Sequence, residues 1–146
     1  MTIPSPVSHG VQTIQQWLKE LRDKGELADE TAAYHVLRAV LHQLRDRLTV
    51  EETVDLAAQM PLIVRGLFFE GWQPHKVPRK IRSKEMFLDE LSKDILPYTY
   101  PVEWAVTAVF ALLWQHCGAG EIADVIGQLP NELKELWPDS ARIYRP

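Results

Sequence analysis

The stretch that decides the fold is ETVDLAAQMP, residues 52–61, because EIADVIGQLP at residues 121–130 repeats its Glu, Asp, Gln and Pro at a constant offset of 69. The match continues outward at the same offset, where Ala39-Val40 falls on Ala108-Val109. An open stack of repeats needs three or more units, whereas two units can close on each other. We therefore predict a compact all-α domain built from two similar four-helix repeats packed around a pseudo-two-fold axis.

Helical periodicity fills most of the chain between these motifs. Apolar residues recur at three- and four-residue spacing over residues 11–24. Thr49 and Glu52 have the spacing of a capping box, which predicts a helix start. Pro61 fits only a first helical turn, which predicts a helix over 62–69. A very apolar helix is expected over 102–116. No segment alternates with period two for long enough to predict a strand.

These patterns divide the chain into one domain and two tails. The two least polar helices, starting near Ala32 and Val102, are expected to pack against each other at the centre. The first ten residues hold Pro4, Pro6 and Gly10, so we expect no helix there. The predicted parts are a flexible N-terminal tail (1–10), a single α-helical domain (11–138) with repeat one (11–72), basic linker (73–82) and repeat two (83–138), and a C-terminal tail (139–146).

Composition narrows the class of protein. The chain has 146 residues, 46% hydrophobic and 25% charged, which is enough for one self-sufficient core. A single cysteine, Cys117, excludes an intramolecular disulfide and indicates a reducing compartment. The longest apolar stretch, residues 102–114, is well short of the ~20 residues that span a membrane. We therefore predict a cytoplasmic protein that makes no use of a membrane.

Several motifs together resemble a known family. They are AQMP at 58–61, RGLFFEGW at 65–72, GAGEIADV at 118–125 and QLP at 128–130. In this combination the chain is similar to the prokaryotic family called domain of unknown function 2267, over about residues 11–138. The resemblance implies an all-helical, internally duplicated bacterial domain. It brings no established activity, cofactor or catalytic residue.

The repeated polar pairs form the first candidate site. Asp55 with Gln59, and Asp124 with Gln128, each place a carboxylate and an amide four residues apart on one helix face. A two-fold arrangement would bring the two carboxylates together, as acid–base and metal sites require. The structural alternative is favoured: each glutamine precedes a proline, where freed backbone groups need partners.

The second candidate is an interaction surface at the end of repeat one. Five of the 16 Lys and Arg residues fall within residues 71–84, which hold none of the 20 acidic residues. Such a segment can bind an anion or an acidic partner, although a solvated linker is the commoner explanation. Gly71 is expected to end a helix, after which the Trp72 ring folds back over the core. The predicted surface comprises Glu70, Trp72, Lys76, Arg79, Lys80 and Arg82.

These observations favour a non-enzymatic interaction module whose partner is another protein or a second copy of the chain. No catalytic constellation is visible, and we expect neither a metal nor a cofactor. The alternative is a small-molecule binder or enzyme with a pocket between the repeats. A weaker alternative is anion or nucleic-acid binding by the 76–84 basic loop, but a pI near 5.7 and the lack of any nucleic-acid motif make nucleic acid unlikely.

Overall fold

The computed structural model describes residues 2–80, 83–95 and 101–145, and over these ranges the chain is helical and contains no strand. The predicted all-α class is confirmed. The elements are α1 (Ser5–Gly25), α2 (Glu30–Arg45), α3 (Val50–Ala58), α4 (Leu62–Phe69), a single 3₁₀ turn (Pro74–Lys76), α5 (Lys84–Asp94), α6 (Val102–His116), α7 (Ala119–Gln128), α8 (Asn131–Lys134) and α9 (Asp139–Arg142). Among these helices, none is both long and apolar enough to cross a membrane.

Helices α2 and α6 contact each other inside the molecule, as predicted from their low polarity. Val36 and Val40 of α2, and Val106 and Val109 of α6, are fully buried. A buried aliphatic side chain of this size contributes roughly 1.5–3 kcal/mol by leaving water. Helix α1 packs on both α2 and α6, so three long helices share one core.

Local sequence signals account for most helix starts. The Asp29 carboxylate accepts a hydrogen bond from the Ala32 amide at 2.8 Å and begins α2. Ser83 caps α5 in the same way by accepting from the Met86 amide at 3.1 Å. Helices α4 and α6 have the predicted bounds. Gly71 has φ +73°, a left-handed conformation that suits glycine at the end of α4.

The expectation that the first ten residues form no helix is wrong. Helix α1 begins at Ser5 rather than Val11, because Pro6 lies in the first helical turn, where its missing amide costs nothing. Gly10 is simply carried within this helix. At the other end, Asp139–Arg142 forms the short helix α9, which contacts α7.

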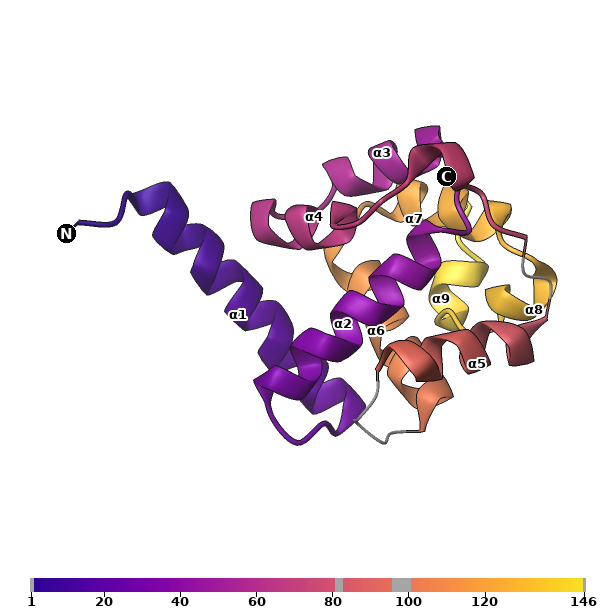
Figure 1. Ribbon diagram of the computed structural model, residues 1–146, viewed down its shortest axis with the longest axis horizontal. Coiled ribbons are helices and arrows are strands. Elements are labelled where there is room, and N and C mark those ends of the chain that lie inside the picture. The colour runs from indigo at the N-terminus through magenta and orange to yellow at the C-terminus, as the bar shows by residue number, and fades with distance from the viewer. Residues whose placement is uncertain (1, 81–82, 96–100, 146) are drawn as a thin grey trace.

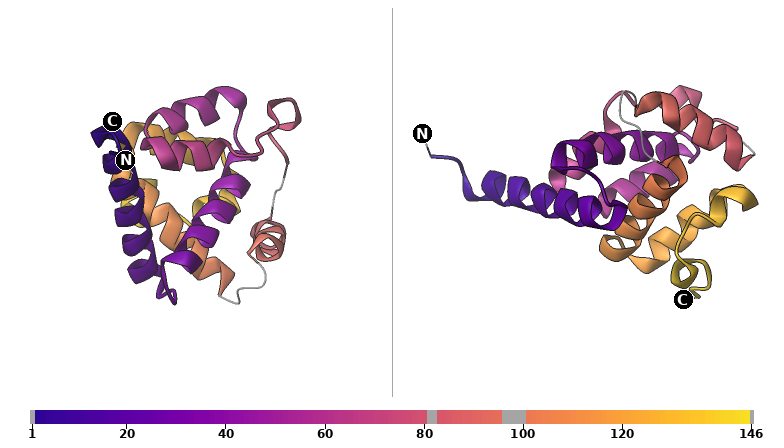
Figure 2. Two further views of the ribbon diagram at one scale, coloured as in Figure 1. Left: turned by 60° about the vertical axis from the view of Figure 1, so that its left-hand side comes forward. Right: turned by 90° about the horizontal axis from the view of Figure 1, so that it is seen from below.

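The N-terminal half of α1 projects from the rest of the molecule (Figure 1; Figure 2, right). The C-terminal half of this helix is anchored by Trp17 and Leu21, which are buried. We call Ile3 and the first turns of α1, residues 3–13, the arm.

Candidate functional site

Helices α3 and α7 contact each other, and three acidic side chains meet where they do so. We call this contact the seam. Glu52 lies in the first turn of α3 and Glu121 in the first turn of α7, with Asp124 nearly one turn further along. One carboxylate oxygen from each residue lies within 4.8 Å of the other two. Glu52 is only 8% exposed, whereas Asp124 faces solvent.

A glutamine at the end of each seam helix caps the start of the other. Gln59, which follows α3, accepts a hydrogen bond from the Gly118 amide at 3.2 Å, just before α7. Gln128, which ends α7, accepts from the Thr49 amide at 3.3 Å, just before α3. Amides at helix starts have no partner within their own helix, so each glutamine satisfies an otherwise open donor.

The predicted capping box is therefore only half formed. The Thr49 hydroxyl accepts from the Glu52 amide at 3.1 Å, as the motif requires. The Glu52 carboxylate, however, does not return to the Thr49 amide, which Gln128 occupies. Instead Glu52 Oε2 accepts a hydrogen bond from Gln128 Nε2 at 3.0 Å. Gln128 of α7 thus takes the place of Glu52 at the Thr49 amide, and the Glu52 side chain lies in the seam instead.

Burial of Glu52 raises the pKa of its carboxyl to about 8. This value also includes the effect of the negative charges of Glu121, Asp124 and Asp55, which act in the same direction as burial. Oε1 of Glu52 and Oε1 of Glu121 are buried, and neither has a hydrogen-bond partner among the described residues. Two carboxylates this close repel each other when both are charged, which favours the protonated form of Glu52.

The structure thus brings together part of the predicted polar site. Gln59 and Gln128 cap helices, which is the structural role favoured from the sequence. Asp124 joins the cluster, while Asp55 is exposed and acts on Glu52 through its charge. Sequence reasoning missed Glu52 and Glu121 as site residues, although the repeat match placed a glutamate at both positions.

Internal ion pairs occupy much of the basic segment. Arg79 donates to Glu90 at 3.2 Å, and its backbone amide donates to the Asp46 carbonyl at 2.7 Å. Lys84 donates to Glu103 at 2.9 Å and to Glu135 at 2.7 Å. Lys76 and Lys80 are exposed, and Arg82 lies outside the described residues. Arg79 and Lys84 are therefore paired with carboxylates of the same molecule, which reduces the charge available to bind an external anion.

Glu70 and Trp72 also have partners inside the molecule. Arg38 donates to Glu70 at 2.7 Å, and this hydrogen bond holds the pKa of the Glu70 carboxyl below its usual value. The Trp72 ring lies 5.3 Å from the Phe69 ring, and Phe69 packs against the core. Its Nε1 is buried, and no described residue accepts a hydrogen bond from it. Cys117 is 7% exposed, and burial raises the pKa of its thiol to about 11, which argues against a nucleophile.

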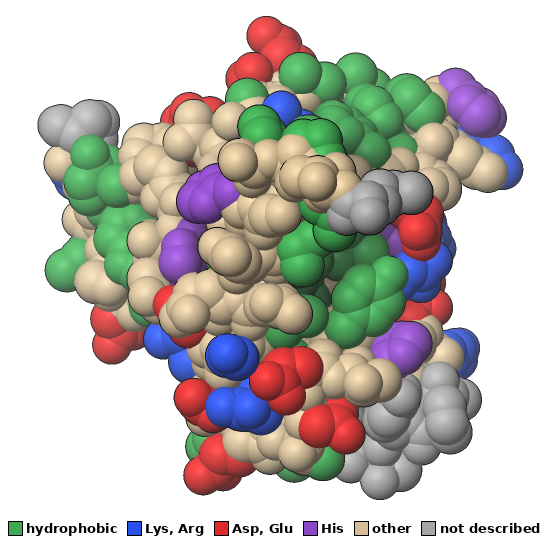
Figure 3. All heavy atoms as spheres, turned by 90° about the vertical axis from the view of Figure 1, so that its left-hand side faces the viewer, with side chains coloured by type: hydrophobic (Ala, Val, Ile, Leu, Met, Phe, Trp, Pro, Cys, Tyr) green, Lys and Arg blue, Asp and Glu red, His purple; other side chains and the backbone are tan. Residues whose placement is uncertain are grey.

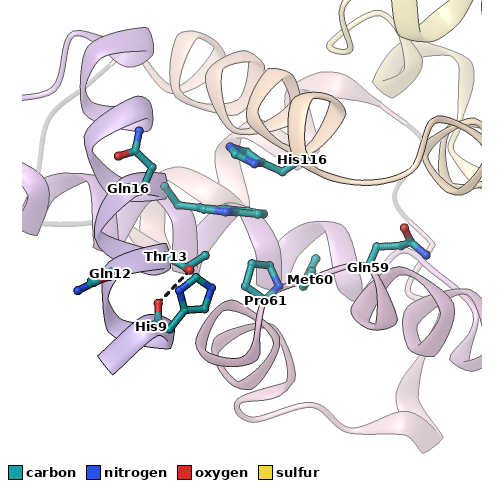
Figure 4. A pocket seen from close by; sticks show the side chains of 9 residues that line it. His9, Gln12, Thr13, Gln16, Gln59, Met60, Pro61 and His116 are labelled. Carbon is teal, nitrogen blue, oxygen red and sulfur yellow. Dashed lines mark hydrogen bonds between the residues drawn. The ribbon is translucent and has the colours of Figure 1, made fainter. Parts of the chain in front are cut away.

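A groove runs between α1 and the segment that joins α3 to α4. Its volume is about 500 Å³. Figure 4 shows His9, Gln12 and Thr13 on one wall, with Pro61 and Met60 opposite. His116 lies at one end of the groove. Its Nε2 donates to Glu20 at 2.5 Å, and its ring stacks on Trp17 with the ring centroids 4.6 Å apart. The groove therefore has one wall formed by the arm itself.

These features define a small all-α protein with a carboxylate-lined helix seam and a projecting N-terminal helix. A model of the family described as "Uncharacterized conserved protein (DUF2267)" matches residues 14–136, and the chain belongs to this family. The resemblance found in the sequence is confirmed. No curated protein matches the chain.

Proposed function

We propose that the chain is a non-enzymatic interaction module that pairs with a second copy of itself through the arm. The observation that carries this proposal is the apolar stripe of α1, which extends beyond the part of the helix that packs on the core. Val7 and Val11 continue the helical stripe of Ile14, Trp17 and Leu21, yet Val7 is 49% and Val11 42% exposed. An amphipathic helix gains stability by burying such a stripe, so this part of α1 lacks its partner.

Helix α4 extends the apolar surface beside the arm. A Cβ added at Gly10 would lie 3.7 Å from Ile63, so the arm lies against α4 at this point. Leu62 is 67% exposed and Ile63 37%, and Ile3 at the tip of the arm is 59% exposed. Figure 3, which views the molecule from the side of the arm, shows hydrophobic side chains gathered around a hollow. Contiguous exposed apolar surface of this kind marks interaction sites.

Charge favours a second copy as the occupant. Residues 2–18 contain no Asp, Glu, Lys or Arg in a chain that is 25% charged and has a net charge of -4. Two copies repel each other over most of their surface but can join along this neutral face without burying a charge. In a two-fold dimer the same patch serves both partners. A stable interface covers about 800 Å² per partner, roughly a tenth of the 8057 Å² surface.

Sedimentation equilibrium over a wide concentration range tests this proposal. The wild-type chain, of 16.8 kDa, should approach twice its monomer mass as concentration rises. A double variant, Val7→Asp with Val11→Asp, should remain monomeric with unchanged helix content, since both side chains are exposed. Met86→Asp is the control, because Met86 is 56% exposed on α5, away from the arm. A wild-type chain that stays monomeric, or a dimer that survives the arm substitutions, would refute the proposal.

We also propose that the fold arose as two similar halves related by a pseudo-two-fold axis. The reciprocal caps support this: Thr49 and Gly118, and Gln59 and Gln128, are each separated by the offset of the sequence match. Glu52 and Glu121, which meet in the seam, have the same separation. Superposition of residues 33–68 on residues 102–137, which are related by the same offset, tests the idea, and halves that do not superpose would overturn it.

A further inference from the structure

We propose that the seam binds a hard divalent cation, with Ca²⁺ as the best fit, through Glu52, Glu121 and Asp124. This site is separate from the arm and does not depend on pairing between copies. Helices α3 and α7 would each supply ligands, so the ion would join two parts of the chain that lie far apart in sequence.

The spacing of the carboxylates suits this ion. One oxygen of each residue lies within 4.8 Å of the other two. Oxygens on opposite sides of a Ca²⁺ ion are about 4.6–5.2 Å apart, and neighbouring ligands are closer, so a single ion can contact all three. Asp124 is exposed, which leaves one side of the site open to the water molecules that complete the coordination shell.

A second observation distinguishes the seam from an ordinary acidic surface. Glu52 is more than nine-tenths buried, and its Oε1 is shielded from solvent and has no hydrogen-bond partner in the part of the chain that the structure describes. Gln128 holds the other oxygen of this carboxylate at 3.0 Å. Glu121 Oε1 is likewise buried and unpaired. A buried carboxylate oxygen without a partner is costly, and a cation supplies a partner for the unpaired oxygen of each residue.

The donor set selects among metals. All three ligand groups are carboxylates, and neither imidazole nor thiolate belongs to the group found among the described residues. Carboxylate oxygens suit Ca²⁺, Mg²⁺ and Mn²⁺, whereas structural zinc sites use cysteine and histidine. Gln128 acts as a positioning residue, because it touches Glu52 rather than the ion.

Calorimetry and thermal unfolding of the full chain, stripped with EDTA and then titrated with CaCl₂, MnCl₂ or MgCl₂, test the proposal. Binding to the folded state alone must raise the melting temperature as the ion concentration rises. We expect a saturable heat of binding and a matching rise for Ca²⁺. Absence of both for all three ions would overturn the proposal.

Glu121→Gln tests the assignment of ligands, because it removes one charged ligand without changing shape. Its affinity for the ion should fall by roughly tenfold or more. Glu52→Gln is a second variant, since its amide oxygen can still accept from Gln128 and the fold is retained. The control is Glu51→Gln, which removes the same charge from the same helix turn at an exposed position. Equal affinities for Glu121→Gln and Glu51→Gln would overturn the assignment. Sedimentation of the stripped protein reports arm pairing separately.

Discussion

Replacing Glu52 by glutamine should remove a pH dependence from the stability of the ion-free protein. In the folded chain this carboxyl keeps its proton up to a pKa of about 8, whereas its usual pKa is 4.5. The folded state therefore binds the extra proton, and the free energy of unfolding falls as pH rises from 4.5 to about 8. Without screening, the free energy of unfolding would fall by about 1.4 kcal/mol per pH unit over this range. Asp124 is exposed, so solvent screens its charge and the effect is smaller than this limit. We expect the free energy of unfolding to fall by about 2 kcal/mol between about pH 6 and pH 9.

Thermal unfolding followed by circular dichroism in EDTA measures this effect. For a chain of this length 2 kcal/mol corresponds to roughly 4–8 °C. The wild-type melting temperature should fall by that amount between the two pH values, relative to Glu52→Gln, which stays neutral. Glu51→Gln should follow the wild type, because Glu51 is exposed. If Glu52→Gln and the wild type lose stability in parallel, the buried carboxyl does not retain its proton and the reasoning fails.

Three further outcomes follow from contacts described in the structure. Arg47 is 2% exposed and binds Glu90, so Arg47→Ala should lower the free energy of unfolding by about 3 kcal/mol. Arg79 binds the same carboxylate but is 46% exposed, so Arg79→Ala should lower it by less than about 1 kcal/mol. Equal losses for the two variants in urea unfolding would contradict this. Gln128→Ala should destabilise more than Gln59→Ala, roughly 2 against 1 kcal/mol, because it also frees Glu52; the reverse order in the same assay would refute the assignment. Cys117 should react with a thiol reagent only as fast as the chain opens, so fast labelling of the folded protein would disprove its burial.

Short-range signals were sufficient for most of the fold. Pro61 and the apolar run after Pro101 gave helices α4 and α6 their correct bounds, because a proline at a helix start acts only on its own turn. The same residue type misled the prediction at the N-terminus. A proline this close to Pro4 and Gly10 predicts a break, but Pro6 lies in the first turn of α1, and whether a proline starts or breaks a helix depends on the turns that follow it.

The candidate site was less accessible to such reasoning. Sequence matching identified Gln59, Gln128 and Asp124, since it needs no knowledge of contacts. The role of Glu52 depends on Gln128, which lies 76 residues away, and no local pattern reveals that pairing. The arm shows a related limitation: only the packing of the body shows that Val7 and Val11 are left uncovered.

The reciprocal glutamine caps make α3 and α7 a single unit for local opening. Unwinding the end of α3 withdraws Gln59 from the start of α7, and unwinding the end of α7 withdraws Gln128 from the start of α3. Neither helix, at nine and ten residues, can therefore fray at one end without loosening the other. Backbone amides of both helices should exchange with solvent at a common rate, even though they are remote in the chain.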